Sequence, residues 1–258
     1  MPFSVVSLGS AVDALTMALL IFLFNVSALI IAILDVKPSR AVNEVALGYI
    51  SGVMISIAFL SLLTNALDQG HMIATASGIL AGASIVWAID KSLLHEHVSG
   101  FIEGRWRLSP KRVWLIAIAM GIHNVPEGLA VGVVLAHSKE LGVSTGISIG
   151  VHDFVETSSL VASMVFIGMS KSAMLLVIIA SSLIESLTVF PGYLLPSLIP
   201  WALPFLLATA AGAMIYVVVE EIVPDIMRET SEHREGALLG FLVGVVTVIA
   251  LQSLLTSL

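Results

Sequence analysis

Long apolar runs separated by short polar or charged joints extend along almost the whole chain. Eight runs can be drawn, at about 10–34, 43–67, 72–94, 113–136, 145–169, 173–195, 200–223 and 236–257. Each is long enough to cross the roughly 30 Å hydrocarbon core of a bilayer as an α-helix, which takes about 20 residues. We therefore expect an all-α, polytopic membrane protein with eight transmembrane helices, in which residues 1–258 form one domain.

The composition excludes several other classes of protein. Of the 258 residues, 58% are hydrophobic and 11% are charged, whereas soluble domains carry about 25% charged residues. These values exclude a soluble globule, a coiled coil and a disordered chain. The absence of cysteine excludes a disulfide framework, a thiolate metal site and a cysteine nucleophile. With 11 Lys and Arg in total, we expect no nucleic-acid partner.

The basic residues predict how the chain is oriented in the membrane. One set of alternating joints contains Lys37, Arg40, Lys91, Arg105, Arg107, Lys111, Arg112, Lys171, Arg228 and Arg234, and the opposite set contains only Lys139. Because cytoplasmic loops carry the excess of Lys and Arg, the first set is assigned to the cytoplasm. The loop at 95–112 is then cytoplasmic, and both termini are extracytoplasmic.

Ionisable and amide side chains interrupt three of the apolar runs near their midpoints. They are His123, Asn124 and Glu127 in the fourth run, His152, Asp153 and Glu156 in the fifth, and Glu185 in the sixth. A charge at the bilayer centre costs roughly 2.5–3.5 kcal/mol on insertion scales. The sequence places no Lys or Arg at this depth, so the carboxyl groups must be protonated or bind cations.

The spacing of the two clusters favours bound cations. Successive helical residues are about 100° apart around the axis, so in each cluster the glutamate projects between the other two side chains. Two facing helices can then form adjacent metal sites that share both glutamates. The first site uses His123 and His152, the second uses Asn124 and Asp153, both share Glu127 and Glu156, and Glu185 is a further ligand of the second.

The donor types narrow the class of metal. Imidazole with carboxylate suits zinc, iron(II), cobalt, nickel and manganese, and the lack of thiolate argues against copper(I). Pro126 lacks an N–H, and its ring disturbs the preceding turn. We therefore expect the fourth helix to be broken beside the site.

The residues His123-Asn124-Val125-Pro126-Glu127-Gly128 resemble the motif of the ZIP (Zrt/Irt-like protein) family of divalent metal transporters. The resemblance extends to His152-Asp153-x-x-Glu156, to Glu185 and to Glu220-Glu221-Ile222-Val223-Pro224. The fifth run departs from the motif, because it lacks the Pro-Glu-Gly of the fourth. The resemblance implies an inverted-repeat bundle, with runs one to three and six to eight flanking runs four and five. It also implies a homodimer and an elevator-like movement of a metal-holding group of helices.

The same resemblance implies a function. Members of the family bring divalent metals into the cytoplasm, so we expect a non-enzymatic importer of zinc first, with iron, manganese, cobalt or cadmium as alternatives. The metal is then cargo bound in transit rather than a catalytic cofactor, and the site of action is the plasma membrane. The resemblance also implies a cytoplasmic exit path with Asp90, His95, His97, Glu220 and Glu221.

Other interpretations of these residues remain open. The buried polar side chains can serve as contacts between helices, and we interpret Asn25, mid-way along the first run, in this sense. A proton-coupled carrier of a small organic substrate can use the carboxyl groups as a relay. An intramembrane metalloenzyme is a further alternative, although the sequence His-Glu-x-x-His of zinc proteases is absent.

Overall fold

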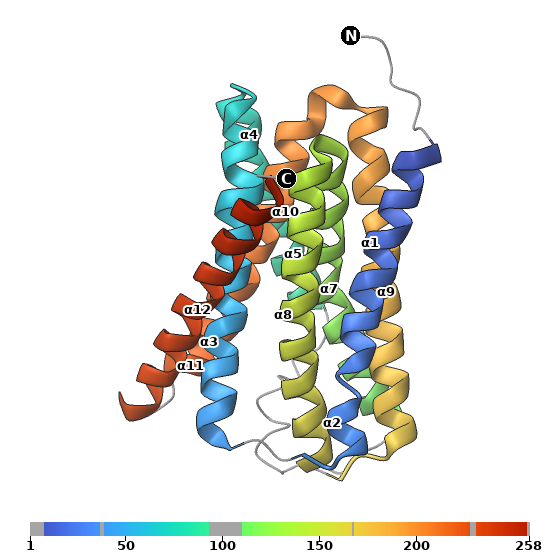
Figure 1. The fold of residues 1–258 in the computed structure, drawn as a ribbon, viewed down its shortest axis with the longest axis vertical. Helices are drawn as coiled ribbons and strands as arrows, with labels where there is room; N and C mark the ends of the chain where they lie inside the picture. Colours follow the sequence, from blue (N-terminus) through green and yellow to red (C-terminus); the bar gives the residue numbers. More distant parts are fainter. Residues whose placement is uncertain (1–7, 37–38, 93–109, 167, 228–230, 257–258) are drawn as a thin grey trace.

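The regular structure of the chain is helical in every part that is described (Figure 1). The computed structural model describes residues 8–36, 39–92, 110–166, 168–227 and 231–256, with some side chains in these ranges left out. The helices are α1 (Leu8–Ser27), α2 (Ile30–Ile33), α3 (Arg40–Ser56), η1 (Ile57–Leu63), α4 (Thr64–Asp68), α5 (Met72–Ser92), α7 (Pro110–His137), α8 (Lys139–Phe166), α9 (Lys171–Leu198), η2 (Pro200–Ala202), α10 (Leu203–Val217), η3 (Val218–Ile222), α11 (Val223–Met227) and α12 (Ser231–Thr256).

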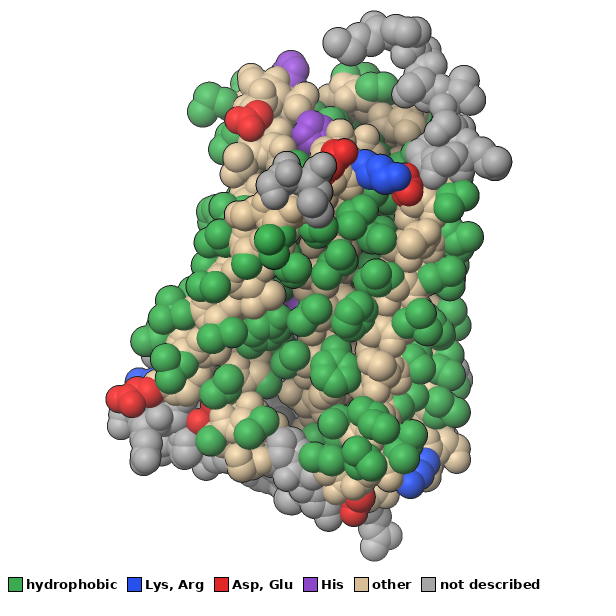
Figure 2. Space-filling model, in the orientation of Figure 1, with side chains coloured by type: hydrophobic (Ala, Val, Ile, Leu, Met, Phe, Trp, Pro, Cys, Tyr) green, Lys and Arg blue, Asp and Glu red, His purple; other side chains and the backbone are tan. Residues whose placement is uncertain are grey.

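The surface of the bundle matches a bilayer. On the face seen in Figure 2, hydrophobic side chains cover the middle of the molecule, and charged side chains lie toward its two ends. Six helical stretches among the described residues are long and apolar enough to span a membrane: Ala11–Ile33, Ala41–Asp68, Met72–Ile89, Lys171–Leu198, Pro200–Glu220 and Arg234–Leu255. The predicted all-α, polytopic membrane fold is thus confirmed.

The helices α7 and α8 are not among these six. Each has 28 residues, which corresponds to a length of about 42 Å and exceeds the thickness of the hydrocarbon core. They carry the polar residues described below, so their sequences are less uniformly apolar. The total of eight spanning helices therefore stays a prediction.

The helices α7 and α8 occupy the middle of the bundle. Figure 1 shows α1 and α9 on one side of this pair, and α3, α10 and α12 on the other. The closest partners along the bundle are α7 with α9, α3 with α12, and α5 with α10, while α1 contacts both α8 and α9. The two central helices therefore contact both flanking groups.

Glycines allow the paired helices to touch through their backbones. A Cβ atom added at Gly128 of α7 would overlap the backbone carbonyl oxygen of Glu185 and the hydroxyl of Thr188, both in α9. A Cβ atom at Gly240 of α12 would overlap the carbonyl oxygen of Val45 in α3. Small residues permit this close approach in membrane bundles, and Gly128 does so beside the polar cluster.

The connection between α7 and α8 is Ser138 alone. Its hydroxyl oxygen accepts a 3.3 Å hydrogen bond from the N–H of Leu141 and so caps the start of α8. Next to this cap, Lys139 forms a 2.9 Å ion pair with Asp13 of α1. These contacts join α1, α7 and α8 at one end of the bundle.

The break expected at Pro126 is not present. The helix α7 continues through Pro126 without interruption, although proline cannot donate to the carbonyl of Ile122. One missing hydrogen bond is a small loss in a helix of 28 residues whose neighbouring turns pack on α9. The expectation of a broken fourth helix was therefore wrong.

Candidate metal centre

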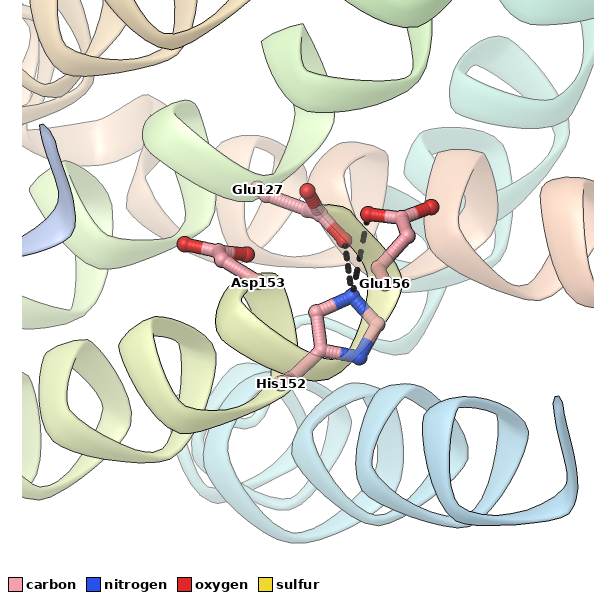
Figure 3. A group of neighbouring side chains, drawn as sticks. All are labelled: Glu127, His152, Asp153 and Glu156. Atoms are coloured by element: carbon pink, nitrogen blue, oxygen red, sulfur yellow. Dashed lines mark hydrogen bonds and ion pairs between the residues drawn. The ribbon is translucent and has the colours of Figure 1, made fainter. Parts of the chain in front are cut away.

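The imidazole of His152 lies between two glutamates in the middle of the bundle. Its Nε2 atom is 2.9 Å from Oε1 of Glu127 on α7 and 3.7 Å from Oε2 of Glu156 on its own helix. Residues four apart lie on one face of a helix, which places His152 and Glu156 together. Figure 3 shows the ring turned toward both carboxylates.

Asp153 completes a cluster of four potential metal ligands. One ligand atom from each of Glu127, His152, Asp153 and Glu156 lies within 4.8 Å of the others. Asp153 follows His152 directly, so its side chain leaves α8 about 100° further around the helix, and in Figure 3 it projects in a different direction from the ring. His152 and Asp153 therefore lie on different sides of Glu127.

A second set of hydrogen bonds surrounds Glu185 on α9. Its Oε2 atom accepts from Nδ2 of Asn124 at 3.0 Å and from Nδ2 of Asn25 at 2.8 Å. The Oδ1 atom of Asn25 in turn accepts from the hydroxyl of Thr157 at 2.6 Å. The residues come from α7, α1, α9 and α8, so four helices meet at this carboxylate.

The two sets of residues are contiguous. The carboxyl groups of Asp153 and Glu185 are close enough to repel each other when both are ionised. Ionised carboxylates are acceptors only, so this arrangement needs a proton or a cation between them. The site thus runs from His152 to Glu185 without a gap.

Several buried polar atoms of the site have no hydrogen-bond donor or acceptor among the described residues. They are Oδ1 of Asn124, Oε2 of Glu127, Nδ1 of His152, both carboxyl oxygens of Asp153 and Oε1 of Glu185. Buried polar atoms are rarely left without a partner. The five oxygens among these atoms are of the kind expected to act as ligands for cations.

The distances fit metal ions with nitrogen and oxygen ligands. Two ligands at about 2.1 Å from a tetrahedral ion are about 3.4 Å apart. The 2.9 Å and 3.7 Å separations around His152 are close to this value. No described Lys or Arg pairs with Glu127, Asp153 or Glu185, and His152 is the described basic side chain that contacts Glu127.

The structure brings together most of the residues expected in the two sites. Glu127, His152, Asp153 and Glu156 form one group, and Asn124 and Glu185 are bonded to each other. The side chain of His123 lies outside the described part of the structure.

The residues expected along an exit path are largely outside the described part. Glu220 is exposed in η3. The side chains of Asp90 and Glu221 and the whole of His95 and His97 are not described.

Two site residues escaped the sequence reasoning. Asn25 was interpreted as a contact between helices, and it does join α1 to α9 through Glu185 and to α8 through Thr157. Thr157 was not singled out. The available signal was its position, one residue after Glu156 and four after Asp153.

Comparison with known proteins identifies the family of the chain. A family model described as ZIP Zinc transporter matches residues 103–252, a range that includes α7, α8 and α9 with their site residues, but not Asn25 of α1. The chain belongs to the ZIP family. It is therefore a multi-pass membrane transporter of divalent metal ions rather than an enzyme.

Three bacterial relatives of this ZIP chain illustrate the similarity. Zinc transporter GufA of Myxococcus xanthus is 31% identical over 191 residues, which is 71% of this chain and 75% of GufA. Zinc transporter ZIPB of Bordetella bronchiseptica is 28% identical over 234 residues, which is 84% of this chain and 73% of ZIPB. Zinc transporter ZupT of Salmonella newport is 25% identical over 235 residues, which is 87% of this chain and 91% of ZupT.

Proposed function

We propose that the protein imports Zn²⁺ into the cytoplasm through two adjacent metal sites formed by α7, α8 and α9. The observation that carries this proposal is the cluster of Glu127, His152, Asp153 and Glu156 in a bundle with an apolar surface. The names of the relatives support zinc as the first choice, and the imidazole ligand is compatible with iron, manganese, cobalt and cadmium as alternatives.

The two sites divide the ligands by their chemistry. The first holds a metal with His152 and His123, and the second holds a metal with oxygen ligands from Asn124, Asp153 and Glu185. Glu127 and Glu156 serve both. Two divalent ions balance the charge of the four carboxylates when all are ionised, whereas one ion leaves two uncompensated charges inside the membrane.

The accessibility along α8 supports release toward the cytoplasm. The side chain of Glu156 is 23% exposed, whereas those of His152 and Glu127 are at most 2% exposed. Glu156 lies on the side of His152 nearer to the end of α8 that the basic residues assign to the cytoplasm. On the opposite side Thr145 and Ser148 are buried, and we therefore propose that the site releases its metal toward the cytoplasm.

Further features of the transporter follow from the family. We place the protein in the plasma membrane as a homodimer of single-domain chains, with both termini outside and the inverted repeat around α7 and α8. Asp90, His95, His97, Glu220 and Glu221 form the exit path in this proposal. Glu220 is exposed in η3, as an exit-path ligand needs to be.

The membrane potential is sufficient to drive this import. When a divalent cation moves into a compartment with an inside-negative potential, its free energy falls by about 4.6 kcal/mol per 100 mV, twice the value for a single charge. The sequence contains no Gly-x-x-x-x-Gly-Lys-Ser/Thr motif for ATP. We therefore propose uptake without ATP.

Uptake in proteoliposomes tests the proposal. Purified protein is reconstituted with an inside-negative potential, and radioactive zinc uptake is measured alone and in competition with cadmium, iron, manganese and cobalt. We expect saturable zinc uptake without ATP. A competing metal should reduce zinc uptake when it binds to the same nitrogen and oxygen ligands. Proton flux without metal uptake would instead support the organic carrier, and proteolysis of added membrane peptides would support the metalloenzyme.

A further inference from the structure

Asn25 is the one residue of α1 that is hydrogen-bonded to the candidate metal centre among the described residues. It is 2% exposed, and its side chain lies between Glu185 of α9 and Thr157 of α8. In an apolar helix, a buried amide of this kind costs free energy unless all of its polar atoms are bonded. Both atoms of the Asn25 amide group have a partner, so its position is specific.

The two partners fix the orientation of the amide. Glu185 accepts from Nδ2, and Thr157 donates to Oδ1. A flipped amide would place Oδ1 against the carboxylate of Glu185, where two acceptors repel each other. Thr157 therefore holds the donor of Asn25 toward Glu185.

The carboxylate of Glu185 is held asymmetrically as a result. Its Oε2 atom receives both amide donors, from Asn25 and Asn124, while Oε1 has no partner among the described residues. Asp153, whose two carboxyl oxygens also lack a partner among them, lies beside this carboxylate. The fixed Oε2 leaves Oε1 and Asp153 to share one cation.

We propose that Asn25 is a positioning residue for the second metal site, acting through Glu185 and itself oriented by Thr157. This inference rests on the proposed function. Asn25 does not need to touch the metal: it keeps the carboxylate in the orientation in which Oε1 is available as a ligand. Residues that orient metal ligands commonly affect metal affinity about 10–100-fold when they are changed.

The same contact also stabilises the empty site. Hydrogen bonds to a charged group are stronger than those between neutral groups, so two amide donors stabilise Glu185 after the metal has left. Because both donors stay on Oε2 whether or not Oε1 binds a cation, Asn25 also keeps the carboxylate in place after the cation has left.

Variants of Asn25 and Thr157 test the inference in the full-length protein. Asn25→Leu keeps the size of the side chain and removes the donor. We expect one bound Zn²⁺ in place of two by native mass spectrometry, and a rise of about tenfold in KM for zinc uptake. Thr157→Val, which only removes the orienting hydroxyl, should shift both readouts in the same direction, whereas Thr157→Ser should restore them.

Matched controls separate positioning from a general loss of packing. Thr209→Val removes a hydroxyl that bonds only to the carbonyl of Phe205 within α10, and it should leave metal content and KM unchanged. In a double-mutant cycle, Asn25→Leu should have no further effect once Glu185→Gln is present, because coupled residues are not additive. If Asn25→Leu does not fold, the Thr157 pair decides the question.

The outcomes distinguish this inference from the proposed function. Two bound ions and an unchanged KM in Asn25→Leu, or equal effects of Thr157→Val and Thr157→Ser, would overturn the role of Asn25. Absence of zinc uptake by the unchanged protein would overturn the proposed function instead. In that case the metal count alone still reports whether Asn25 acts on the second site.

Discussion

The Nε2 atom of His152 lies 2.9 Å from Oε1 of Glu127, across the contact between α8 and α7. Both residues are 1% exposed, so water does not take the place of either side chain when the other is removed. A nitrogen that carries a proton toward Glu127 cannot bind a metal at the same time, since a histidine ligand must be free of that proton. Metal binding at His152 therefore replaces this hydrogen bond, and each of the two residues becomes a ligand.

Glu127→Gln should abolish transport. The substitution keeps the shape of the side chain and removes the charge that the two proposed metal ions share. Substitution of residues that only orient metal ligands lowers metal affinity or activity about 10–100-fold. Because Glu127 is itself a proposed ligand, we expect zinc uptake to fall by at least about 100-fold. Uptake in proteoliposomes and metal counting on the purified variant check this result, with Glu140→Gln at the exposed start of α8 as the control. Uptake that stays near that of the unchanged protein would remove Glu127 from the path.

Asp153→Asn should separate the two sites. Asp153 belongs to the oxygen-rich side of the cluster, so its change should remove mainly the second ion and leave the one at His152. We expect native mass spectrometry to find one Zn²⁺ per chain in place of two. Loss of both ions in Asp153→Asn, or a single ion in the unchanged protein, would show that the ligands are not divided in this way.

Gly128→Ala should damage the second site through the backbone. The added methyl group would overlap the carbonyl oxygen of Glu185 and the hydroxyl of Thr188, so α9 must move away from α7. Overpacking of this kind costs about 1–3 kcal/mol, and the movement should also lengthen the bond from Asn124 to Glu185. We expect a lower Tm in detergent together with loss of the second ion.

Gly236→Ala is the matched control for this effect. A Cβ atom added at Gly236 would lie 3.5 Å from the side chain of Val45, which is an ordinary van der Waals distance. The same substitution in α12 should therefore leave both the Tm and the metal count unchanged. Equal losses in the two variants would mean that the contact at Gly128 has no special role.

The sequence predicted the helices and much of the site for a simple reason. Long apolar runs have one stable form in lipid, and residues three and four apart in a helix share a face. This spacing was sufficient to predict that Glu127 would lie near His152 and Glu156. It required only that α7 and α8 face each other, which the matching clusters suggested.

The remaining features depend on contacts that the sequence does not encode locally. Asn25 and Glu185 are 160 positions apart, and a helix that is apolar on all sides does not show which neighbour it packs against. The π-helical stretches η1 and η3 leave no signature in the pattern of apolar residues. The continuity of α7 through Pro126 likewise depends on packing against α9 rather than on the proline itself.

Single-cysteine labelling should establish the orientation of the chain. The protein has no cysteine, so each introduced one gives a signal without background. The excess of Lys and Arg assigns the end of the bundle that includes Lys171 to the cytoplasm. Gln69→Cys and Glu140→Cys lie at the opposite end, in exposed positions, and a membrane-impermeant maleimide should label both in intact cells. Lys171→Cys, which is also exposed, should react only after the membrane is opened. Labelling of Lys171→Cys in intact cells, with Gln69→Cys protected, would reverse the orientation, and Glu156 would then lie on the outer side of His152.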